Sequence, residues 1–167
     1  MTRAAARVWR LTPAIALPCL LACGKSAVGS AASDEINTMS AKVDGTAWSS
    51  RYQSATFESA TGTGTLTGAP STFYGEITIY TPSLQEGTYR LGSRVDSGQG
   101  KAQYFQSMYS ICETTAGEEF TGHVTISSYD RAARSVMGSF AFRGHCWRVG
   151  DTVSVTDGRF FLSVENR

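Results

Sequence analysis

Short runs of alternating apolar and polar residues, each ended by turn residues, constrain the fold of this 167-residue chain more than any other feature. In the clearest run, over residues 135–143, Val136, Gly138, Phe140 and Phe142 share one face. An alternation with a period of two is typical of half-buried β-strands. Such runs recur roughly every 8–12 residues, which is the spacing of a sandwich or barrel. The pattern predicts an all-β domain, an antiparallel β-sandwich or flattened β-barrel of about 8–10 strands.

The last run contains a change of phase. Val153 and Val155 share one parity, whereas Phe160 and Leu162 share the other, and Asp157-Gly158 lies between them. A slip of one residue would turn every core side chain of a strand toward solvent. We therefore expect a β-bulge or a tight turn at Asp157-Gly158.

The N-terminus has the organisation of an export signal. Arg3, Arg7 and Arg10 form a basic start without a nearby acid, and an uncharged stretch of 14 residues follows over positions 11–24. That stretch is too short to cross ~30 Å of hydrocarbon as a helix, and its length is typical of the apolar region of a signal peptide. We predict that residues 1–22 are a cleaved signal peptide.

The uncharged stretch ends in Leu20-Leu21-Ala22-Cys23-Gly24, which resembles a bacterial lipobox. The resemblance implies cleavage before Cys23, a diacylglyceryl thioether on its sulfur and an acyl chain such as palmitate on its new amine. Two or more acyl chains anchor a protein stably in a membrane. Gly24 carries no inner-membrane retention signal where lipoproteins are sorted by this residue, so we expect an outer-membrane anchor on the periplasmic or cell-surface face. The alternative is an ordinary secretory signal in which Cys23 is incidental.

Removal of the signal peptide changes the charge balance. The remaining 145 residues carry 12 basic and 14 acidic side chains, a net charge of −2. This balance lacks the basic excess of nucleic-acid-binding proteins, so we expect no nucleic-acid partner and a membrane contact made through the lipid on Cys23. Residues 23–40 are mostly small and polar, which predicts a lipidated cysteine and a flexible tether before a β domain over residues 41–167.

Three segments of the domain resemble those of a known family. They are Ala41–Trp48 with the pattern x-V-D-G-x-x-W, Gly122–Asp130 leading into Gly138–Phe142 with G-x-F-x-F, and Val153–Phe160 with V-T-x-G-x-F. The chain is similar in these segments to an uncharacterised family of small bacterial envelope lipoproteins, over roughly Ala41–Val164. The shared residues are glycines and aromatics on strands and turns, so the resemblance implies a fold and supplies no catalytic residues.

Two cysteines remain in the predicted β domain, Cys112 and Cys146. A cysteine pair in an exported protein is typical of a disulfide, which would close a loop of 34 residues here. The alternative is a metal or nucleophile site that adds His123 and His145. Zinc takes four such ligands, but the usual ligand spacings are absent, so we expect no metal and no cofactor.

Patterns that would indicate an enzyme are weak. No G-x-S-x-G nucleophile elbow occurs, and the glycines Gly62, Gly64 and Gly68 lack the Lys-Ser/Thr of a phosphate loop. Glu118 and Glu119 are neighbours in sequence. Such a pair is typical of a solvated loop rather than of catalytic carboxylates that converge on one substrate bond. We therefore predict that the protein is not an enzyme.

Tyrosines offer a further hypothesis. Tyr74, Tyr80, Tyr104 and Tyr109 lie on neighbouring predicted strands and would form a sugar- or peptide-binding platform if they shared a face, or would lie at the margins of the core if they did not. The function we expect is a non-enzymatic anchored binding or structural module, whose ligand, a protein or a saccharide, the sequence leaves unknown. The alternative is a lipocalin-like carrier of a small apolar ligand.

Overall fold

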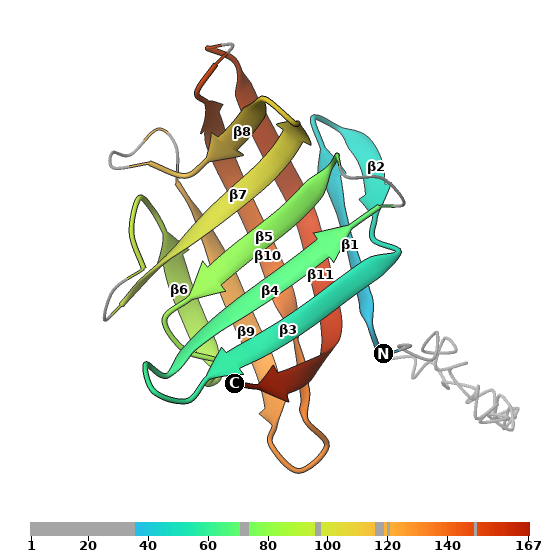
Figure 1. Ribbon diagram of the computed structural model, residues 1–167, viewed down its shortest axis with the longest axis vertical. Coiled ribbons are helices and arrows are strands. Elements are labelled where there is room, and N and C mark those ends of the chain that lie inside the picture. The colour runs from blue at the N-terminus through green and yellow to red at the C-terminus, as the bar shows by residue number, and fades with distance from the viewer. Residues whose placement is uncertain (1–35, 71–73, 96–97, 116–118, 120, 149) are drawn as a thin grey trace, which may run out of the picture. The chain divides into compact units, whose positions relative to one another are not determined.

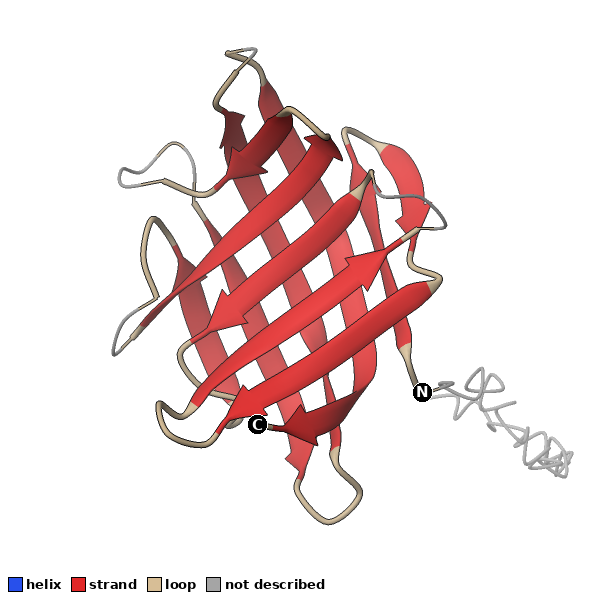
Figure 2. Cartoon of the chain, viewed as in Figure 1, coloured by secondary structure: helices blue, strands red, loops and turns tan. Residues whose placement is uncertain are grey.

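The computed structural model describes residues 36–70, 74–95, 98–115, 119, 121–148 and 150–167. These residues belong to a compact unit over Ser33–Arg167 and form β-strands without any helix (Figure 2). The strands are β1 Thr38–Val43, β2 Thr46–Ser49, β3 Tyr52–Glu58, β4 Thr63–Ala69, β5 Glu76–Thr81, β6 Gly87–Leu91, β7 Gln99–Ser107, β8 Ser110–Glu113, β9 Gly122–Asp130, β10 Ser135–Cys146 and β11 Thr152–Asn166.

The strands close into a flattened barrel. Strand β11 bonds to β10 on one side, and on its other side to β1 and then, near its end, to β3. From β3 the pairing continues through β4, β5, β7, β6 and β9 back to β10. Figure 1 shows β3, β4, β5 and β7 crossing in front of β9, β10 and β11, so two layers enclose one core. The all-β prediction is confirmed.

Strand number and direction differ from the prediction of an antiparallel domain of 8–10 strands. The described residues form eleven strands, and the sheet is mixed because β3 runs parallel to β11 and β6 runs parallel to β7. Side chains alternate in the same way in parallel and antiparallel pairs, so the sequence pattern does not reveal strand direction. Strand β1 also begins at Thr38, inside the segment expected to be a tether.

The predicted irregularity in the last strand is a β-bulge. Phe140 and Phe142 are two residues apart on β10, but their partners on β11, Gly158 and Val155, are three residues apart. The pairing of β11 with β1 shows the same shift. Asp157 adopts a φ of 54° within this step. The bulge keeps Val155 and Phe160 both buried although their spacing is odd.

Two glycines of the shared motifs each lie opposite an aromatic ring. Gly138 pairs with Phe160, and Phe140 pairs with Gly158, across β10 and β11. A Cβ atom on Gly138 would lie 2.6 Å from the Phe160 ring, and one on Gly158 would lie 2.6 Å from the Phe140 ring. The two rings are stacked with centroids 6.3 Å apart. Each glycine therefore supplies the space that the opposite ring fills.

The x-V-D-G-x-x-W segment forms the hairpin between β1 and β2. Asp44 and Gly45 have φ values of 48° and 79°, as the mirror-image turn of a two-residue hairpin requires. The hairpin carries Trp48, whose Nε1 donates a hydrogen bond of 2.7 Å to the carbonyl oxygen of Gly75. The aromatic of this motif therefore links the hairpin to the start of β5.

Side chains fill the space between the two layers. The buried apolar residues form one cluster that draws on both layers and on the hairpin. Gly64 and Gly68 allow close packing of neighbouring side chains. A Cβ atom on Gly64 would lie 2.5 Å from Leu84, and one on Gly68 would lie 2.6 Å from Met39. The largest fully buried side chains are Phe140, Met39, Leu66, Ile77, Ile79, Leu84, Leu91, Ile126, Leu162, Val124, Val136 and Val155.

Candidate functional site

Exposed apolar side chains gather at the end of the barrel that carries β8. Met108 and Tyr109 lie in the turn before β8, Ile111 lies on it, and Trp147 follows β10. Their exposed fractions are 71%, 68%, 37% and 64%, and they make up half of the large hydrophobic side chains that are exposed among the described residues. Together with Glu113 and Arg148 they form what we call the aromatic end. A cluster of this kind on a folded domain is typical of a binding surface.

A disulfide holds the strands that carry the aromatic end. Strand β8 pairs with both β7 and β10, and Cys112 lies directly opposite Cys146. The two cysteines form the predicted disulfide, and both are buried. Because neighbours along a strand point to opposite faces, burial of Cys112 turns Ile111 and Glu113 outward.

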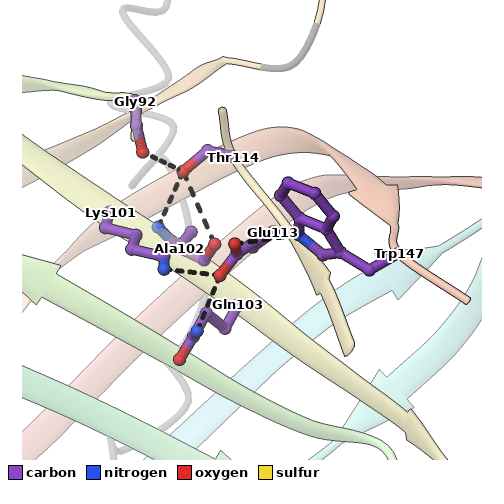
Figure 3. Close-up of polar contacts among 7 residues, drawn as sticks. All are labelled: Gly92, Lys101, Ala102, Gln103, Glu113, Thr114 and Trp147. Atoms are coloured by element: carbon purple, nitrogen blue, oxygen red, sulfur yellow. Dashed lines mark hydrogen bonds and ion pairs between the residues drawn. The ribbon is translucent and has the colours of Figure 1, made fainter. Parts of the chain in front are cut away.

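The Glu113 carboxylate is the polar centre of the site (Figure 3). It accepts hydrogen bonds of 2.9 Å from the Gln103 side-chain amide and 2.9 Å from Nε1 of Trp147. The Lys101 ammonium group lies 2.5 Å from the same carboxylate. Trp147 is therefore held by its polar edge although its ring is largely exposed, which fixes the ring before any ligand arrives.

The surroundings of Glu113 also set its charge. Burial alone would raise the pKa of the carboxyl group, but hydrogen bonds from Lys101 and Gln103, the charge of Lys101 and the bond from Trp147 together hold that pKa below its ordinary value. The carboxylate is ionised at neutral pH and acts as an acceptor of hydrogen bonds.

The end of β8 is fixed by a buried hydroxyl group. Thr114 is 1% exposed, and its hydroxyl donates a hydrogen bond of 2.6 Å to the Gly92 carbonyl oxygen. The hydroxyl oxygen of Thr114 also accepts a hydrogen bond of 3.0 Å from the backbone N–H of Ala102 (Figure 3). Thr114 thus ties β8 to β7 directly after Glu113, which keeps the carboxylate in place.

A surface cleft of about 310 Å³ lies between the exposed rings, lined by Tyr109, Ile111, Glu113, Trp147 and Arg148. The Arg148 guanidinium lies 5.7 Å from the centre of the Tyr109 ring, within the range of a cation–π contact. The cleft thus offers two aromatic rings, one aliphatic side chain, one carboxylate and one guanidinium.

The residues that the sequence singled out lie in different places. Cys23 and Glu118 are outside the described residues, as are the signal peptide and most of the predicted tether. His123 is exposed on β9, and both cysteine sulfurs of the alternative metal site are joined in the disulfide. Within the part of the chain that the structure describes, no group of three or more His, Cys, Asp or Glu side chains is placed to hold a metal ion.

The four tyrosines of the platform hypothesis do not share a face. Tyr104 pairs with the buried Ile77 and packs against the core, where burial and the charge of Asp44 raise the pKa of its hydroxyl group. Tyr80 pairs with Lys101, on the outward parity of the same sheet. Of the four, Tyr109 joins the aromatic end.

Sequence reasoning did not identify Trp147, Arg148 or Ile111 as site residues. The one available signal was position, because Trp147 directly follows a cysteine predicted to be in a disulfide. A large aromatic next to a buried cross-link is held at the surface with little freedom to fold inward.

A family model described as "Domain of unknown function (DUF6252)" matches residues 36–163. The chain belongs to this family. The match spans β1 to most of β11 and therefore covers the closed barrel of the DUF6252 domain. The searches of curated proteins and of solved structures found no match. Among the described residues of the DUF6252 domain, no helix is long and apolar enough to cross a membrane.

Proposed function

We propose that the protein is a lipoprotein of the bacterial envelope whose β domain is a non-enzymatic binding module. Cys23 would carry the lipid, and the segment up to β1 would connect it to the domain. The support for export and anchoring is the basic start, the short apolar stretch and the lipobox-like Leu20–Gly24. Gly24 favours the outer membrane over the inner membrane.

The observation that carries the binding role is the aromatic end. Exposed Tyr109 and Trp147 cost solubility and contribute nothing to the core, yet the Cys112–Cys146 disulfide and the Glu113 hydrogen bonds hold their surroundings rigid. Rigid exposed aromatics beside an arginine are typical of the residues that dominate binding energies. Figure 1 places β8 at the top of the view, whereas the described chain starts lower down, so this end is clear of the point where the tether joins.

Two observations favour binding over the other hypotheses. Glu113 is ionised and already accepts three donors, so it suits ligand contact better than proton transfer to a substrate. A carrier of a small apolar ligand needs an internal chamber, whereas side chains fill the space between the layers here. Among the residues that the structure describes, no observation therefore favours the carrier.

The anchor is tested by labelling cells with a radioactive fatty acid. We expect the full chain to incorporate label and to fractionate with membranes, and the Cys23→Ala variant to lose both properties. An unchanged membrane fraction for Cys23→Ala would contradict the lipid anchor.

The binding role is tested by returning the protein, carrying Cys23→Ser so that it stays soluble, to washed envelopes. We expect saturable binding that drops at least tenfold, by about 1.4 kcal/mol or more, with Trp147→Ala. Tyr52→Ala is the matched control, because Tyr52 is an equally exposed aromatic, 69% exposed, on β3. Equal binding by the Trp147 and Tyr52 variants would rule out the aromatic end as the binding surface.

A further inference from the structure

We propose that the cleft between Tyr109 and Trp147 binds a saccharide, with one sugar ring stacked on an aromatic ring and its hydroxyl groups directed to Glu113 and Arg148. This inference rests on the proposed binding role of the aromatic end and names its class of ligand. Three features of the cleft carry it: the Trp147 ring held by Glu113 beside the Tyr109 ring, the free acceptor capacity of Glu113 and the size of the hollow.

The rings match the apolar side of a sugar. One face of a pyranose ring presents C–H groups, which are attracted to the electron-rich face of an aromatic ring. Trp147 is 64% exposed, and its only polar atom, Nε1, is bound to Glu113. The part of the indole that remains for a ligand is therefore its apolar surface, held in one orientation.

The polar groups match the hydroxyl side of a sugar. A carboxylate offers about four acceptor positions. Lys101, Gln103 and Trp147 occupy three positions on Glu113, so one remains for a donor from a ligand. The ionised carboxylate accepts a hydroxyl group, and the Arg148 guanidinium, which also lines the cleft, offers donors to sugar oxygens.

The scale of the cleft favours a saccharide over a folded protein partner. A hollow of about 310 Å³ lined by five residues has the size of a small-ligand site. A stable protein interface engages roughly 20–30 residues on each side. The exposed apolar side chains here are confined to two short segments next to β8 and β10.

The test uses the mature chain carrying Cys23→Ser and soluble oligosaccharides of glucose, galactose, N-acetylglucosamine and galacturonic acid. Trp9 lies in the predicted signal peptide, so Trp48 and Trp147 are the tryptophans that remain. We expect at least one oligosaccharide to protect Trp147 from quenching by iodide. This protection should be absent from Trp147→Phe, in which the remaining fluorescence comes from Trp48. Calorimetric titration supplies the affinity independently of fluorescence.

Three variants define the site. We expect Tyr109→Ala and Glu113→Gln each to weaken saccharide binding at least tenfold, because one removes a ring and the other replaces the acceptor with an amide. Tyr52→Ala should bind as the parent does, and circular dichroism of each variant separates lost binding from lost folding. If either Tyr109→Ala or Glu113→Gln unfolds, the other variant still tests the site. Competition between oligosaccharides for the parent chain tests it as well.

The outcomes are separable. Failure of every oligosaccharide to bind the parent chain overturns the proposal, as does binding that Tyr109→Ala, Glu113→Gln and Tyr52→Ala leave equally unchanged. Envelope binding that requires Trp147 but is not inhibited by any oligosaccharide also overturns the proposal that the ligand is a saccharide. The binding role of the aromatic end would then still hold. Loss of lipid labelling at Cys23 bears on the anchor alone.

Discussion

Two aromatic pairs in this domain are held in place by different means. Phe140 and Phe160 lie inside the barrel, and the glycines opposite them provide matching space. Tyr109 and Trp147 lie at the surface, where a guanidinium covers one ring and a carboxylate holds the edge of the other. Shape complementarity orders the first pair, and hydrogen bonds and a nearby disulfide order the second.

The difference shows which residues make the fold and which are available for a ligand. The buried pair belongs to the G-x-F-x-F and V-T-x-G-x-F segments and joins β10 to β11. The exposed pair lies in connections next to β8 and β10 and could change without disturbing the core. Folds are determined by such buried pairs, whereas functions depend on sites placed on them.

The largest effect should come from truncating an aromatic inside the barrel. Phe140 is 1% exposed, so Phe140→Ala removes a buried ring and leaves a cavity. We expect it to lower the free energy of unfolding by about 4 kcal/mol. Tyr109→Ala makes the same kind of truncation at the surface and should change that free energy by less than about 0.5 kcal/mol. Urea unfolding of the mature chain measures both values, and similar losses would break the distinction between the two pairs.

A slightly smaller effect should follow from removing the disulfide beneath the aromatic end. Cys112→Ala combined with Cys146→Ala opens a loop that spans 34 residues. The chain-entropy model gives a loss of about 3–4 kcal/mol in unfolding free energy. Urea unfolding gives the loss, and iodide quenching of Trp147 shows whether the site loosens. If quenching stays at the level of the parent chain, the disulfide does not order the exposed pair.

The smallest effect concerns the carboxylate that holds Trp147. Because the pKa of Glu113 is lowered in the folded state, its charge stabilises the fold above the unfolded pKa, and this contribution is lost as pH falls through the folded pKa. Glu113→Gln should therefore be less stable than the parent at neutral pH, by about 1 kcal/mol or less.

The stability difference should close as the pH falls below about 4, near the ordinary glutamate pKa. Urea unfolding across this pH range measures the gap, and Glu58→Gln at the exposed end of β3 serves as the control. A gap that persists at low pH would show that shape, rather than charge, explains the role of Glu113.

Sequence patterns predicted the interior of this domain well. The alternation around Phe140 and the change of phase at Asp157-Gly158 indicated buried faces and a bulge, and both are present. The Cys112–Cys146 disulfide was also predicted, because a disulfide is typical of a lone cysteine pair in a protein that is expected to be exported. These features depend on local period and composition, which a sequence displays directly.

The aromatic end was not predictable in the same way. Its members come from the turn before β8, from β8 and from the end of β10, and they meet because β8 inserts between β7 and β10. That insertion is a property of strand order, which alternation does not encode. The parallel pairing of β3 with β11 escaped prediction for the same reason.

Strand β11 has a consequence for the order of events during synthesis. It is the last strand of the chain, yet it contacts β1, β3 and β10 and supplies the seam that closes the barrel. Contacts between segments this far apart in sequence form slowly. Without the 15 residues of β11, the described strands cannot close into the barrel or complete its core. Closure of the described barrel therefore depends on a strand that is synthesised after all of the strands that it joins.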